Sequence, residues 1–173
     1  MNCIQRNLRN LLPLLGMCCA MGSHAATQTA TMDVSATIVA SCKLSVMGLK
    51  FDNVEPGVDK NAAAVLASTC TSGTAYTLDL SNGGHSTTTG GTGDQFRRQM
   101  ASGNNRLPYI LYKDGGAEIG ASAAGAGNNN LLTDGMGNGY EKSMNIYGRV
   151  IGAETKNSRA GNYSDQVVVT IAF

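Results

Sequence analysis

The last ten residues, SDQVVVTIAF (Ser164–Phe173), decide the fold class of this sequence. The apolar residues of odd number in this stretch share one face of an extended chain: Val167, Val169, Ile171 and Phe173. The residues between them are Val168, Thr170 and Ala172. An alternation of period two with this β-branched content predicts a β-strand with one buried face. Such a face needs another part of the protein, or a partner, to cover it.

A second alternating stretch lies near the other end, in ATQTATMDVSATIVASC (Ala26–Cys42). Its apolar residues of even number include Met32, Val34, Ala36 and Ile38. The alternation is longer than the five or six residues of a typical strand. Both ends of the sequence therefore have the pattern of a strand.

Short strand patterns separated by glycine-rich turns fill the region between the two ends. We expect strands at 42–46, 64–70, 76–80, 97–100, 107–112, 143–150 and 166–173. The segment 114–139 is rich in glycine and is expected to be an exposed loop, and a helical turn is expected only near 61–64. This number of short strands predicts an all-β fold of the sandwich type.

Composition limits the class of protein. The chain has 173 residues, the length of one ordinary domain, with 22 glycines, no tryptophan and 14% charged residues. Its formal net charge is +1, and no stretch resembles a basic patch. We therefore expect no nucleic-acid partner.

The first 25 residues have the pattern of a secretory signal peptide. Arg6 and Arg9 precede an apolar run, and small residues stand at Ser23 and Ala25, where cleavage is expected. The run is too short for a transmembrane helix. A buried helix and a lipoprotein anchored at Cys18 or Cys19 are the weaker alternatives. Cleavage lowers the Lys and Arg count from 13 to 11, against 12 acidic residues.

Two cysteines, Cys42 and Cys70, remain after the expected cleavage. An even pair in an exported chain predicts one disulfide bond. Two free thiols or a metal pair are the alternatives, but no CxxC spacing or second histidine supports them.

The expected mature chain offers little for catalysis or for cofactors. Its one histidine, His85, stands in a glycine-rich and threonine-rich loop that cannot hold a catalytic geometry rigidly. Asp134 with Asn128–Asn130 supplies oxygen atoms, but not in the order of a calcium loop. Arg97 and Arg98 are expected to point to opposite faces of an edge strand kept soluble by charge. We expect no enzyme activity, no metal and no cofactor.

Several motifs together resemble the spore coat protein U domain family, which includes the pilin subunits of archaic, Csu-type chaperone-usher pili. They are CTSGTAY (70–76), RRQM (97–100), LPYILYKD (107–114), YGRV (147–150) and AGNYSDQVVVTIAF (160–173). The resemblance covers the whole expected mature chain.

The resemblance implies an incomplete immunoglobulin-like β-sandwich that is completed by an intermolecular donor strand. It divides the chain into a signal peptide (1–25), a donor-strand extension (26–41) and a sandwich domain (42–173). The implied donor side chains are Met32, Val34, Ala36 and Ile38. The implied acceptor and chaperone-binding side chains are Val167, Val169, Ile171 and Phe173.

The same resemblance implies a structural pilin exported to the periplasm and assembled into a surface fibre for adhesion and biofilm growth. Its implied partners are identical or related pilin subunits, a periplasmic chaperone and an outer-membrane usher. Two other functions stay open at this point. One is a secreted monomeric carbohydrate-binding or adhesin module, and the other is a spore or capsule coat protein built from the same domain.

Overall fold

The computed structural model is an antiparallel β-sandwich and describes residues 25–87, 96–121 and 131–173. The compact domain begins at Thr37. Residues 25–36 form a separate unit, in which no helix or strand is present. The predicted signal peptide lies almost wholly outside the described residues and stays a prediction.

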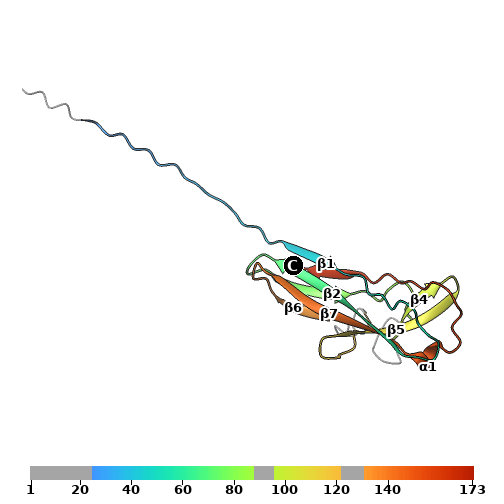
Figure 1. Ribbon diagram of the computed structural model, residues 1–173. Coiled ribbons are helices and arrows are strands. Elements are labelled where there is room, and N and C mark those ends of the chain that lie inside the picture. The colour runs from blue at the N-terminus through green and yellow to red at the C-terminus, as the bar shows by residue number, and fades with distance from the viewer. Residues whose placement is uncertain (1–24, 88–95, 122–130) are drawn as a thin grey trace, which may run out of the picture. The chain divides into compact units, whose positions relative to one another are not determined.

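The described residues contain eight strands and one short helix (Figure 1). They are β1 (Cys42–Val46), β2 (Lys60–Cys70), β3 (Ala75–Leu80), β4 (Arg98–Ser102), β5 (Asn105–Lys113), β6 (Leu131–Met136), β7 (Glu141–Val150), α1 (Gly152–Thr155) and β8 (Val169–Ala172). Five strands form one sheet in the order β1-β2-β7-β5-β4, and three form a second sheet in the order β6-β3-β8. All pairings in the two sheets are antiparallel.

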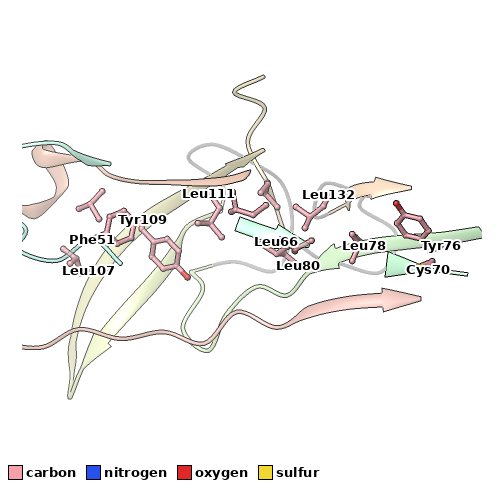
Figure 2. Packing of buried hydrophobic residues seen from close by; sticks show 13 residues of the cluster. Phe51, Leu66, Cys70, Tyr76, Leu78, Leu80, Leu107, Tyr109, Leu111 and Leu132 are labelled. Atoms are coloured by element: carbon pink, nitrogen blue, oxygen red, sulfur yellow. The ribbon is translucent and has the colours of Figure 1, made fainter. Parts of the chain in front are cut away.

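The core lies between the two sheets and follows the period of two that the sequence shows. In β2, β3 and β7 the buried apolar side chains have even numbers, whereas in β5 the core side chains have odd numbers and Ile110 is buried as well. Figure 2 shows side chains of this core, including Leu132 of β6: Leu66, Tyr76, Leu78, Leu80, Leu107, Tyr109, Leu111 and Leu132. The all-β fold class predicted from the sequence is confirmed.

Four sequence predictions about secondary structure are wrong. The expected turn near Asn61 is part of β2, because this stretch forms a long ladder with β7. Part of the expected loop 114–139 is β6, which pairs with β3. The strand expected over 166–173 is β8, which begins only at Val169, because Val168 donates its N–H to the side-chain Oγ of Ser81 and not to a ladder carbonyl.

The fourth error is the short helix α1, which the sequence did not indicate. Asp59 orders its first turn, because the carboxylate accepts a hydrogen bond from the Gly152 N–H at 2.7 Å and pairs with Arg149. The side-chain bond to Arg149 is the main cause that lowers the pKa of Asp59. Thr155 Oγ1 accepts a bond from the Gly57 N–H at 2.9 Å, which ties the helix to the β1–β2 connection.

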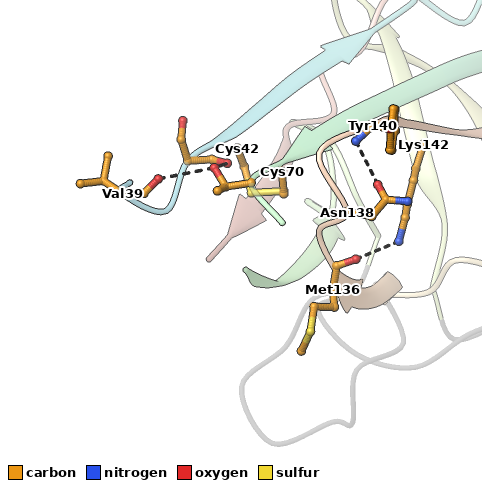
Figure 3. The surroundings of a disulfide bond; sticks show 9 residues. Val39, Cys42, Cys70, Met136, Asn138, Tyr140 and Lys142 are labelled. Carbon is orange, nitrogen blue, oxygen red and sulfur yellow. Dashed lines mark hydrogen bonds between the residues drawn. A yellow bond between two sulfur atoms is a disulfide. The ribbon is translucent and has the colours of Figure 1, made fainter. Parts of the chain in front are cut away.

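A disulfide bond joins Cys42 and Cys70, which face each other across β1 and β2 (Figure 3). It fastens β1, which is an edge strand of the five-stranded sheet, to the longest strand of the fold. The bond between the Thr71 N–H and the Ser41 carbonyl, at 2.9 Å, continues the same ladder beyond the disulfide. The start of the domain is thus fixed both covalently and by backbone pairing.

Replacing both Cys42 and Cys70 with alanine should lower the free energy of unfolding by about 3 to 4 kcal/mol. The disulfide joins two cysteines that are 28 residues apart in the sequence, and the loop-entropy relation gives roughly this value for a loop of that length. Urea unfolding followed by circular dichroism, with the oxidised and reduced wild-type chain as the matched pair, measures it. Equal midpoints for the variant and the oxidised chain would contradict the prediction.

Candidate functional site

A large groove opens between the two sheets along one side of the domain. Its volume is about 1210 Å³, and residues 46–54 and 158–169 form its two walls. Protein interiors are close-packed and rarely contain voids larger than a water molecule. An opening of this size in the described part of the sandwich therefore leaves room for a further apolar element.

The floor of the groove is the hydrophobic core. Core residues from four strands line it: Leu66, Leu80, Leu107, Leu111 and Ile146. A buried layer that also lines a groove becomes more stable when apolar side chains fill that groove, at about 25 cal/mol for each Å² removed from water. The floor consequently favours an apolar occupant.

One wall of the groove is the connection that follows β1. Leu49 and Phe51 pack over β7 at Gly148, where an added Cβ would lie 2.8 Å from the Phe51 ring and 2.9 Å from Leu49. The absence of a side chain at Gly148 thus lets this wall lie against the sheet. Asp52 has a φ of 52°, a left-handed conformation that Asp adopts more readily than most residues.

The other wall is formed by residues 158–168, named here the wall segment. It is held to β4 by two backbone bonds between Ser164 and Ala101, at 2.8 and 3.0 Å. Farther along, Val168 accepts a bond from the Ser81 N–H at 2.8 Å. The wall segment therefore crosses from the edge of the five-stranded sheet to the three-stranded sheet before β8 begins.

Two strand edges reach the groove: Val46, the last residue of β1, and Val169, the first residue of β8, both line it. β8 pairs with β3 and β1 pairs with β2, and within the described ranges no strand pairs with the other edge of either one. The two strands lie side by side (Figure 1). A free strand edge is a template for pairing with another strand. The groove therefore offers an apolar floor and unpaired backbone groups at the same place, which is the surface that an added β-strand requires.

Comparison with known proteins agrees with this geometry. The sequence profile described as the Spore Coat Protein U domain matches residues 28–170. The chain belongs to the spore coat protein U domain family. No curated protein sequence matches the chain significantly.

Among solved structures, the spore coat protein U domain described here is similar to a chain from archaic chaperone-usher Csu pili of Acinetobacter baumannii, in the crystal structure of the CsuC–CsuE chaperone–tip adhesion subunit pre-assembly complex. The TM-score is 0.53 and the sequence identity is 19%. The match covers 79% of this chain and 41% of the Csu chain, so more than half of that chain has no counterpart here. The likeness shows a shared fold, an incomplete immunoglobulin-like sandwich.

The four residues predicted as acceptors do not all lie in the same environment. Val167, Val169 and Ile171 are half-buried and pack against the core, as their parity predicts. Val167 and Val169 line the groove. Phe173 is 60% exposed and does not belong to the groove lining, so the structure does not bring it together with the other three.

The residues predicted as donors are exposed. Met32, Val34 and Ile38 expose 84%, 84% and 87% of their surface, and Ala36 is exposed as well. Apolar side chains with this exposure are unusual in a folded protein when they recur along one segment. Their role as donors stays a prediction.

A polar cluster beside the groove was missed by sequence reasoning. Arg98, expected to keep an edge strand soluble, exposes only 1% of its surface, because β4 turns this side chain inward. Its guanidinium donates hydrogen bonds to the carbonyls of Ser81, Ile119 and Gly120. The Phe96 ring lies 4.9 Å from it. Burial is the main cause that lowers the pKa of Arg98.

Tyr109 and Asp165 complete this cluster. The Tyr109 hydroxyl donates a hydrogen bond to Asp165 Oδ2 at 2.6 Å, and Tyr109 is the cross-strand neighbour of Arg98. Burial first, and then the bond to Asp165, raise the pKa of Tyr109 far above its usual range. The signal for this cluster was present in the motifs RRQM, LPY and YSD, but only the fold brings them together.

The other sites considered in the sequence gain no support from the described residues. His85 is exposed. No group of three His, Cys, Asp or Glu side chains able to hold a metal occurs in the part of the chain that the structure describes. Asp134 is exposed, and Asn128–Asn130 lie outside the described residues. Over the same described ranges, no helix has the length and apolar character to cross a membrane.

The raised pKa of Tyr109 predicts a stability that falls in alkaline solution. An unfolded tyrosine releases its proton near pH 10, whereas Tyr109 in the folded domain keeps its proton to higher pH. The unfolded state then binds fewer protons than the folded state, so the free energy of unfolding decreases as the pH rises above about 10. Below that pH the contribution of Tyr109 to stability is fully present. Tyr109→Phe should make this decrease less steep.

Urea unfolding at several pH values from about 8 to about 11.5, on both sides of the ordinary tyrosine pKa near 10, measures the slope. Tyr112→Phe, which removes a hydroxyl from the same strand, is the matched control. Equal slopes for the two variants would show that Tyr109 ionises like an ordinary tyrosine.

Proposed function

We propose that this protein is a structural pilin subunit that polymerises by donor-strand complementation into a chaperone-usher surface fibre. The observation that carries the proposal is the groove, which has an apolar floor and is reached by the ends of β1 and β8, two strands that each have one edge unpaired within the described residues. In this mode of recognition an extended segment adds a strand to a sheet edge, and its alternate side chains fill pockets. The domain has no enzymatic role in this proposal.

The donor is the exposed segment around Thr29–Ile38 of another copy. Its apolar side chains of even number are Met32, Val34, Ala36 and Ile38. Burying such side chains contributes roughly 1.5 to 3 kcal/mol each, and less for the alanine, which gives about 8 kcal/mol before ordering costs. Backbone bonds to the edges of the groove add to this value.

The contact runs from the head of one subunit to the tail of the next. Donor and acceptor are different surfaces of the same chain, so each subunit has one of each. A heterologous contact that does not close into a ring produces a filament. Three residues, 39–41, separate Ile38 from Cys42, and three extended residues span only about 11 Å. Successive domains in such a fibre therefore lie close together.

The partners follow from the same groove. Before polymerisation an open core must be covered, and a periplasmic chaperone that lends a strand fulfils this need. An outer-membrane usher then exchanges the chaperone strand for the donor segment of the next subunit. The expected signal peptide places this assembly in the periplasm and on the cell surface, where the fibre serves adhesion and biofilm growth.

A charge in the donor segment should block assembly only when it stands on the face that enters the groove. Val34→Asp places a carboxylate where the proposal has an apolar side chain entering the groove, and burying an unpaired charge is very unfavourable. We expect no fibres from this variant. Ser35→Asp, its neighbour of opposite parity, is the matched control and should still form fibres. Electron microscopy of cells expressing each variant measures the difference, and fibres from Val34→Asp would contradict the proposed donor face.

The state of the isolated protein tests the open groove itself. Expressed in the periplasm without a chaperone, the chain should aggregate or form fibres, because its core is exposed to water. With the chaperone it should elute from a sizing column as a soluble one-to-one complex. A stable monomer without any partner would show that the chain closes its own sandwich, and would favour a monomeric binding or adhesin module.

A further inference from the structure

The Asp165 carboxylate ties the wall segment to two other parts of the domain, β5 and the loop that follows β3. Its Oδ2 accepts the hydrogen bond from the Tyr109 hydroxyl at 2.6 Å, and its Oδ1 accepts a bond from the Gly84 N–H at 2.8 Å. Asp165 and Tyr109 both line the groove. A hydrogen bond to a charged acceptor is shorter and about twice as strong as one between neutral groups.

The loop after β3 is shaped to receive this carboxylate. Gly83 has a φ of 79°, and a Cβ added there would lie 2.2 Å from Asp165 Oδ2. Gly83 therefore supplies both the left-handed backbone and the close approach that the carboxylate needs. Ser81, in the same loop, accepts a bond from the Gly83 N–H at 3.4 Å and another from the Val168 N–H at 2.8 Å through its hydroxyl oxygen.

Arg98 fixes the other partners of the wall segment. Its guanidinium holds the Ser81 carbonyl with two N–H groups, at 3.2 and 2.9 Å. Ser81 in turn bonds Val168 through both its N–H and its hydroxyl. The buried charge of Arg98 also interacts favourably with the Asp165 carboxylate. Residues 165 to 168 are thus held at both ends by polar contacts.

We propose that the bond between Tyr109 and Asp165 holds the wall segment away from the groove floor and keeps the groove ready for the incoming strand. Asp165 and Tyr109 are positioning residues for donor-strand uptake, and this inference rests on the proposed function. Val167 already packs against the core, and without the bond the wall segment can move farther onto the apolar floor, because that movement buries more apolar surface. The donor would then have to displace it.

The physical effect is preorganisation. A site that already has its bound conformation avoids the ordering cost that a mobile segment adds to binding. An apolar side chain in the place of Asp165 would favour collapse onto the floor, whereas a carboxylate with fixed donors has one preferred position. The polar cluster therefore acts on the rate of strand uptake as well as on the stability of the domain.

Uptake of a labelled synthetic peptide of residues 27–41 by the full-length subunit in complex with its chaperone tests the inference. The variants are Tyr109→Phe, Asp165→Asn and the double variant, with Tyr112→Phe as the control for loss of a tyrosine hydroxyl from β5. We expect uptake about tenfold slower in both single variants, the scale of one hydrogen bond to a charged group. The double variant should be no slower than the slower single variant, because both changes remove the same contact.

Two further outcomes distinguish this inference from a purely structural role and from failure of the proposed function. A purely structural role would lower the melting temperature of the peptide-filled Tyr109→Phe subunit but leave its uptake rate equal to that of Tyr112→Phe. That result would overturn the inference and leave the proposed function standing. Failure of the wild-type complex to take up the peptide would overturn both. Where Asp165→Asn gives no soluble complex, the comparison of Tyr109→Phe with Tyr112→Phe decides alone.

Discussion

Within the described residues, β1 and β8 each have one edge that no strand pairs with, and both strands reach an open apolar core. The rest of this structure depends on this constraint. Each edge carries backbone donors and acceptors that need partners, and the floor between them is a hydrophobic layer that needs cover. A soluble domain normally removes such edges by pairing, by charge or by a covering loop. Here the edges and the open layer coincide, so one added strand satisfies both needs at once.

The domain must stay folded while its core is incomplete, and its other features serve this requirement. The disulfide fixes the edge strand β1 to β2, and β2 forms the longest ladder of the fold with β7. Gly148 allows Leu49 and Phe51 to cover the inner face of β7 closely, which keeps part of the core closed. The disulfide and the longest ladder among the described strands therefore both belong to the five-stranded sheet.

Sequence reasoning reached the fold class, most strands and the disulfide because these depend on local patterns. The period of two in Val167–Ile171 gives the buried face of the last strand, and an even pair of cysteines in an exported chain gives the bond. It failed where a distant residue decides. The Ser81 hydroxyl ends the ladder at Val168, and β6 forms in a glycine-rich segment only because β3 lies beside it. Arg98 looked like a surface charge because the carbonyls that surround it come from residues 81, 119 and 120.

Arg98, which the sequence analysis placed at the surface and the structure buries, helps to explain how a groove with an apolar floor can remain open. Apolar contacts have no preferred direction, so a wall made only of such contacts would slide toward the floor until the opening closed. Hydrogen bonds have direction, and a buried network with all its members satisfied favours a single arrangement. In this domain the wall segment carries its apolar side chains toward the groove while a carboxylate, a tyrosine hydroxyl and a buried guanidinium set its position. A polymer built by strand exchange needs such a state, since a subunit that closes on itself cannot receive the next one.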